Sequence, residues 1–299
     1  MAGPKPEEPP RIEIEVEPTA VGRFARWAER GRAVGKRAQV VRGDHASVDL
    51  AFTLVERDAT IGGGMLAGAL AYRLFVFLLP ASLLLVSGLG LYADTVNKST
   101  TQAAKDAGLH GLIASEVAST ASHGSRLAVF IVMIPAVLYG LTTLYRAVAK
   151  VHGLVWYGSG RGVPIPPKRI GIFGLLLVVQ LATLEIVSWI RRSSEVGGIL
   201  ALIGYFVVVA ASWLVVSMGL PNRRVRWLAL VPGALAFALG MEFVNAFNVY
   251  VTTRLVEERA DTYGALGVAA ALLFSLVLVG RVIVFSAELN STLDEQRRR

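Results

Sequence analysis

Long apolar stretches with few charged residues recur along this chain, and they leave it few ways to fold. A lipid bilayer has a hydrocarbon core about 30 Å thick, which a helix of roughly 20 apolar residues can cross. Stretches of about this length or longer lie at 61–92, 127–145, 170–190, 198–218, 227–252 and 263–287. Hydrocarbon offers no partner for a free backbone N–H or C=O group, so each stretch is predicted to be helical. The predicted fold class is therefore all-α, a polytopic membrane protein with six transmembrane helices.

The composition excludes two broad classes of protein. Hydrophobic residues make up 54% of the 299 residues and charged residues only 17%, whereas soluble proteins average roughly 25% charged residues. The chain is therefore not an ordinary soluble domain. A disordered chain is excluded as well, because disorder requires low hydrophobicity.

The basic residues between the apolar stretches predict how the helices are oriented. The loops 146–169 and 219–226 contain Lys and Arg but no acidic residue, and further Arg residues follow the last stretch. With six spans, these segments lie on the same side of the membrane as both chain ends. Loops rich in Lys and Arg remain in the cytoplasm, so both termini are predicted to be cytoplasmic.

Outside the membrane domain, the sequence predicts three shorter parts. Residues 1–20 are rich in Pro and Glu and resemble a disordered tail, and residues 291–299 form a cytoplasmic tail after the membrane domain at 61–290. Residues 21–60 are predicted to form amphipathic helices, one of them at 48–55. These helices either lie on anionic lipid at the membrane surface or pack as a cap on their own protein, and the sequence leaves both alternatives open.

Polar and charged residues within the apolar stretches are the candidate site. A charge at the middle of a bilayer costs roughly 2.5–3.5 kcal/mol or more, so such residues usually face the protein interior. Glu242, Asn245, Asn248 and Thr252 recur along one side of the fifth predicted helix, which therefore should not face lipid. The predicted site residues are Arg73, Glu242, Asn245, Asn248, Arg281 and Glu288.

Two interpretations of these residues stay open. Either Arg73 and Arg281 neutralise Glu242 and Glu288 and so lock the helices together, or the residues line a polar cavity that opens towards the cytoplasm. In the second case the arginines would attract an anionic headgroup, while Glu242, Asn245 and Asn248 would line its path. Glu288 would then hold Arg281 or take up protons.

Small residues and prolines predict details of the packing. Gly64 and Gly68 form a G-x-x-x-G pattern, which favours close contact between membrane helices. Pro80, Pro135 and Pro232 fall within apolar stretches, where proline produces a kink or marks the start of a helix.

No known catalytic motif accompanies these features. The chain has no Cys and only four scattered His residues, and it contains no H-E-x-x-H, G-x-S-x-G or P-loop sequence. We therefore predict a protein that is not an enzyme and that uses no metal or cofactor. Nucleic acid is not an expected partner, because the basic residues follow the membrane topology instead of forming one soluble patch.

Three segments resemble a known family. They are AYRLFVFLLP at 71–80, LYRAVAKVHG at 144–153 and YGALGVAAALLFSLVLVGRVIVFSAELN at 263–290. Together they resemble the YihY/BrkB inner-membrane proteins over about residues 45–292. Two departures are that Ser286 replaces the usual glycine and that 274–278 lacks the common tryptophan-rich string.

The resemblance implies a multi-pass protein of the bacterial inner membrane, linked to serum resistance and to handling of envelope lipids. The family has also been called ribonuclease BN, but this sequence shows no nuclease site that would support that name. The leading hypothesis is a transporter-like protein that moves or accommodates a lipid or a lipid-linked anion, with membrane lipids as partners. The alternatives are a non-transporting scaffold that docks partners through its first 60 residues and, more weakly, a membrane-bound hydrolase. Homo-oligomerisation stays open.

Overall fold

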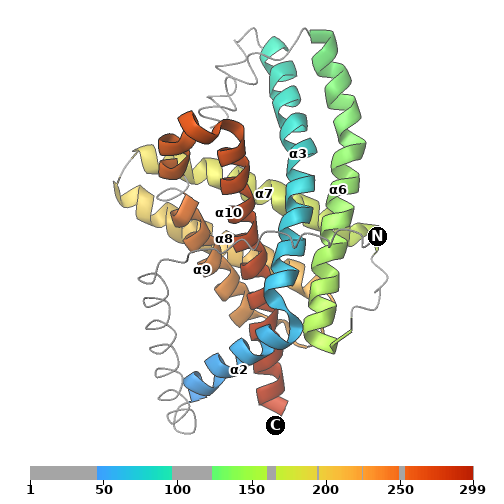
Figure 1. The fold of residues 1–299 in the computed structure, drawn as a ribbon, viewed down its shortest axis with the longest axis vertical. Helices are drawn as coiled ribbons and strands as arrows, with labels where there is room; N and C mark the ends of the chain where they lie inside the picture. Colours follow the sequence, from blue (N-terminus) through green and yellow to red (C-terminus); the bar gives the residue numbers. More distant parts are fainter. Residues whose placement is uncertain are drawn as a thin grey trace, which may run out of the picture. The chain divides into compact units, whose positions relative to one another are not determined.

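The computed structural model describes residues 46–95, 123–159, 166–193, 195–223, 225–248 and 253–298, and within them it is entirely helical (Figure 1). The helices are α2 (Ala46–Ile61), α3 (Gly63–Thr95), α6 (His123–Tyr157), α7 (Pro167–Ser193), α8 (Glu195–Gly219), α9 (Val231–Phe247) and α10 (Thr253–Arg298), with a 3₁₀ turn at Trp227–Ala229. The chain divides into two units after Thr53, and the bundle described below belongs to the second, Leu54–Arg299. The predicted tail at 1–20 and Thr252 lie outside the described residues.

Each predicted apolar stretch overlaps one helix of this bundle, although α9 covers only Val231–Phe247 of the stretch at 227–252. In the described part of the chain, four helical segments are long and apolar enough to cross a membrane, namely Gly63–Tyr92, Arg126–Tyr157, Leu202–Gly219 and Ala269–Arg298. Helix α9 is also apolar but shorter, and α7 falls outside both groups. The all-helical class is thus confirmed, together with several membrane-length apolar helices.

Helix α10 holds the bundle together. It packs against α3, α6 and α9, while α3 also packs along α6, and α8 packs between α7 and α9. Figure 1 shows α3 and α6 running side by side as a long pair. The buried apolar core extends over all six helices from α3 to α10.

The prolines occupy two kinds of position. Pro80 and Pro135 lie inside α3 and α6, where membrane helices tolerate them. Pro232 instead occupies the first turn of α9, where the missing N–H costs no helical hydrogen bond. The sequence prediction of a kink or a helix start is confirmed at Pro232, which marks a start.

Close helix packing depends on glycines other than those the G-x-x-x-G pattern indicates. A Cβ atom at Gly64 or Gly68 would meet nothing within 4 Å, so neither glycine forms a helix contact within the described bundle. A Cβ atom at Gly280 of α10 would lie 2.4 Å from the backbone oxygen of Ala67 on α3. Glycine at position 280 therefore allows the backbones of α3 and α10 to approach closely. The prediction that Gly64 and Gly68 make such a contact was wrong for the described bundle.

Helix α2 extends beyond the predicted 48–55. It ends at Ile61, and the following Gly62 has a φ of +69°, which turns the chain into α3 and lies in the left-handed region that favours glycine. Val55 is 68% exposed, whereas Leu54 is buried. The amphipathic stretch expected before α2 lies outside the described residues.

Candidate functional site

The six predicted site residues do not form one site. Arg281 and Glu288 lie on α10 near the end of α2, and Glu242 and Asn248 lie on and just after α9. Arg73 on α3 is exposed, and the structure gives it no ion pair with any described residue. The predicted pairing of Arg73 with an intramembrane glutamate is therefore not found among those residues.

Arg281 binds a carboxylate that the sequence analysis did not single out. Its Nη1 donates to Asp58 Oδ1 at 2.7 Å and its Nη2 donates to Asp58 Oδ2 at 3.1 Å. Two parallel hydrogen bonds of this kind are the strong, geometrically specific form of an arginine–carboxylate pair. An ionic lock does exist, but it joins α10 to α2 through Asp58. Asp58 was missed because it lies before the first apolar stretch.

Arg57, the neighbour of Asp58, joins three helices. Its Nη1 donates to Glu295 at 2.9 Å, and its Nη2 donates to Ser291 Oγ at 2.8 Å, both on α10. The same Nη2 donates to the carbonyl oxygen of Val155 near the end of α6 at 2.7 Å. The end of α2 is thus fastened to α6 and α10 by directed hydrogen bonds, which supports the cap interpretation for this part of α2.

Glu288 lies among these charged groups. It is only 1% exposed, and its Oε1 has no hydrogen-bond partner among the described residues. Asp58, Arg281 and Arg57 are the charged groups that act on it. Around Glu288 thus lie one further carboxylate and two guanidinium groups, and because Arg57 also pairs with Glu295, the two arginines offset only part of the cost of burying Glu288.

The polar stripe on α9 is divided. Glu242 is half-buried and acts electrostatically on Tyr205 of α8, and the Asn248 side-chain oxygen accepts a hydrogen bond from Ser275 Oγ on α10. Asn245, between these two residues on α9, is exposed. The stripe is therefore not buried along its whole length, and the prediction that it avoids lipid stays a prediction.

The segment Ser286–Asn290 supplies contacts that place α8 and α9. The indole N–H of Trp213 on α8 donates to Ser286 Oγ at 3.0 Å, and the Trp213 ring stacks on Phe237 with centroids 4.0 Å apart. Asn290 Oδ1 accepts the backbone N–H of Gly233 at 2.7 Å, and its Nδ2 donates to the carbonyl of Leu230 at 3.2 Å. Ser286, the departure from the family pattern, thus supplies the acceptor that a buried indole requires.

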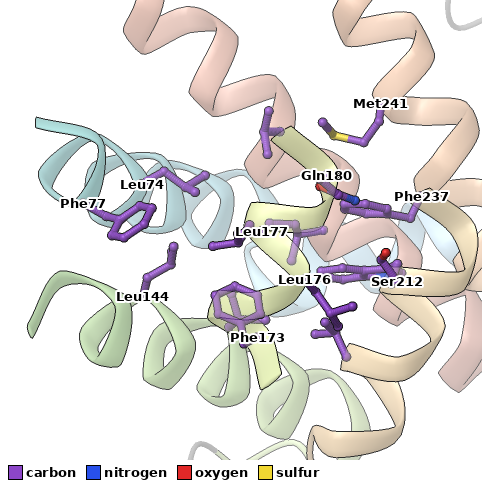
Figure 2. A pocket seen from close by; sticks show the side chains of 15 residues that line it. Leu74, Phe77, Leu144, Phe173, Leu176, Leu177, Gln180, Ser212, Phe237 and Met241 are labelled. Carbon is purple, nitrogen blue, oxygen red and sulfur yellow. The ribbon is translucent and has the colours of Figure 1, made fainter. Parts of the chain in front are cut away.

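A cavity of about 160 Å³ lies among the helices, and all six from α3 to α10 line it. Figure 2 shows the side chains that converge on it, and among those labelled only Gln180 and Ser212 carry nitrogen or oxygen. The apolar lining includes Leu74 and Phe77 (α3), Leu144 and Val148 (α6), Leu176 and Leu177 (α7), Trp213 and Val216 (α8), Phe237 and Met241 (α9), and Val279 and Ile283 (α10). None of the six predicted site residues lines this cavity, so it is distinct from the polar cavity that one of the two interpretations predicted.

The described residues offer no metal centre. Within these ranges, no three His, Asp or Glu side chains come together closely enough to hold an ion. The described part of the bundle thus contains an apolar cavity and, separately, an ionic cluster that joins α2 to α10.

Comparisons with known proteins also indicate a membrane protein. A family model described as Virulence factor BrkB matches residues 60–299. A UPF0761 membrane protein of Rhodospirillum centenum is 29% identical over 143 residues, which cover 45% of this chain and 32% of that relative. The matched part thus spans about a third of the relative's length, and no solved structure matches. Because the family model covers well over half of the sequence, the chain belongs to the Virulence factor BrkB family of membrane proteins.

Proposed function

We propose that this protein accommodates the acyl chain of a membrane lipid, or of another amphipathic envelope molecule, between its helices and moves it in a transporter-like manner. The apolar cavity lined by all six helices is the observation that carries the proposal. The proposal includes no catalytic step, and it assigns the ionic groups of α2 and α10 to holding the bundle.

The lining of the cavity favours a hydrocarbon ligand over a polar one. A polar group buried without a hydrogen-bond partner costs roughly 1–3 kcal/mol in proteins. Among the described residues the lining offers the side chains of Gln180 and Ser212, while the indole N–H of Trp213 is already bound to Ser286. An apolar cavity of about 150 Å³ can stay dry and bind benzene. A space of about 160 Å³ therefore has room for several methylene groups of an acyl chain.

Filling the cavity is expected to block lipid movement. Leu177→Trp places an indole where the acyl chain would lie, so we expect redistribution of fluorescent lipid between the leaflets of reconstituted vesicles to slow by roughly tenfold or more. Leu175→Trp is the matched control on the same helix, because Leu175 is exposed and does not line the cavity. Thermal unfolding checks that both variants fold. Equal rates in the two variants, or no movement with wild-type protein, would count against the proposal.

We also propose that α3, α6, α7, α8, α9 and α10 each cross the bacterial inner membrane and that both chain ends are cytoplasmic. The chain has no Cys, so single cysteines can be introduced directly. Ser159→Cys follows α6 and Ser194→Cys follows α7. In right-side-out membrane vesicles, an impermeant maleimide should label the cysteine at 194 and should reach that at 159 only after permeabilisation. Labelling of both, or of neither, would show that α7 does not cross.

A further inference from the structure

A second, smaller cavity of about 60 Å³ adjoins the large one. Phe173 of α7 and Val216 of α8 line both cavities, so these two side chains form a shared wall. The small cavity also touches Tyr145, Arg169 and Gly219. It therefore lies where the first turn of α7 meets the end of α8, beside α6.

A charged side chain lines this cavity, whereas the polar side chains Gln180 and Ser212 of the large cavity carry no charge. Arg169 Nη1 donates to the carbonyl oxygen of Gly219 at 2.7 Å, and the Tyr145 hydroxyl donates to the same oxygen at 3.3 Å. Arg169 is exposed, so its guanidinium remains accessible from outside the bundle. No acidic side chain lines the cavity among the described residues. The small cavity thus carries a positive charge on the far side of the wall that it shares with the large cavity.

A guanidinium presents five N–H donors in a planar fork that matches phosphate and carboxylate oxygens. One of the donors of Arg169 is taken by its hydrogen bond to the carbonyl oxygen of Gly219 at the end of α8. Exposed Lys168 and Arg146 are the sequence neighbours of Arg169 and Tyr145, and they add positive charge at the same end of the bundle. An anion bound there would be held by charge-assisted hydrogen bonds, which are roughly twice as strong as neutral ones.

We propose that Arg169 binds the headgroup of an anionic lipid, with Tyr145 holding the Gly219 carbonyl that positions Arg169, and that the acyl chain passes Phe173 and Val216 into the large cavity. The inference rests on the proposed function and specifies its substrate class. It also replaces the headgroup role expected for Arg281 and Arg73, since Arg281 is bound by Asp58 and Arg73 does not line either cavity.

The test must separate anion binding from the role of Arg169 in capping α8. Arg169→Gln keeps a side-chain N–H donor for the Gly219 carbonyl and removes the charge, whereas Arg169→Lys keeps the charge. The purified protein in neutral detergent is titrated with phosphatidylglycerol, with phosphatidylcholine and with inorganic phosphate, and thermal unfolding reports binding.

We expect phosphatidylglycerol to stabilise wild type and Arg169→Lys at much lower concentration than phosphatidylcholine. In Arg169→Gln the apparent affinity for phosphatidylglycerol should fall roughly tenfold, while that for phosphatidylcholine stays the same. A pure capping role would lower the unfolding temperature of Arg169→Gln without changing the preference between lipids, and would overturn the inference. Equal stabilisation by inorganic phosphate would overturn it too, because the site would then bind the free anion.

The two proposals fail in different assays. If the titration shows no preference for the anionic lipid, the proposed headgroup site is ruled out. The comparison of Leu177→Trp with Leu175→Trp still tests the proposed function. If Leu177→Trp moves lipid as fast as Leu175→Trp, the proposed function fails even where binding of phosphatidylglycerol depends on Arg169.

Discussion

Arg57→Met is expected to lower the free energy of unfolding by about 1–3 kcal/mol, because the carbonyl oxygen of Val155 loses its side-chain donor and Glu295 keeps only the more distant Arg223. The Arg57 side chain is only 18% exposed, and its hydrogen bonds reach α6 and α10. Methionine keeps the length of the side chain but no donor. The Val155 carbonyl and Ser291 would lose the same partner, so the end of α2 should detach from the bundle before the rest unfolds.

Thermal unfolding in detergent, with proteolysis near Gly62 as a second measurement, tests this expectation. Arg73→Met is the matched control, since the same substitution there affects an exposed arginine without an ion pair to the described residues. We expect its effect to stay within about 0.5 kcal/mol. Similar losses in the two variants would mean that the hydrogen bonds of Arg57 contribute little to stability.

Gly280→Val is expected to separate α3 from α10 and to destabilise the bundle by about 3 kcal/mol or more, at the upper end of overpacking effects. A Cβ atom at position 280 would lie 2.4 Å from the oxygen and 3.1 Å from the carbon of the Ala67 carbonyl. These are backbone atoms of a neighbouring helix, so no side chain can move aside to relieve the clash.

Gly68→Val provides the comparison on the other helix of the same pair. A Cβ atom at Gly68 meets nothing within 4 Å, so the added side chain should be tolerated and the unfolding temperature should change little. Unfolding of the two variants side by side, with yield of folded protein as a check, measures the difference. A larger loss at Gly68 than at Gly280 would contradict the observed packing of α3 on α10.

Much of the fold could be predicted from the sequence. The length and apolarity of a stretch decide whether a helix can cross hydrocarbon, and both are properties of consecutive residues. Each predicted stretch accordingly overlaps a helix, and Pro232 marks the start of α9 as its position suggested. The closing segment also proved informative, since Ser286 and Asn290 place α8 and α9.

The candidate site could be predicted only in part. Arg281 and Glu288 do lie in one ionic cluster, but Asp58, the carboxylate that binds Arg281, comes from a helix outside the apolar stretches. One of the two interpretations predicted a polar cavity, because polar residues on a membrane helix usually face the protein interior. The lining of the observed cavity is made of ordinary apolar residues, which no sequence pattern distinguishes from the rest of the core.

The sequence by itself determined which segments are apolar helices, where several of them begin and end, and which family the chain resembles. Only the tertiary structure decided that Arg281 binds Asp58, 223 residues away, that Gly280 rather than Gly64 or Gly68 permits a close helix contact, and that an apolar cavity remains between the helices. The reason is physical. Helix formation in lipid depends on the local hydropathy of consecutive residues, whereas ion pairing, steric fit and empty space depend on how distant helices are turned towards one another.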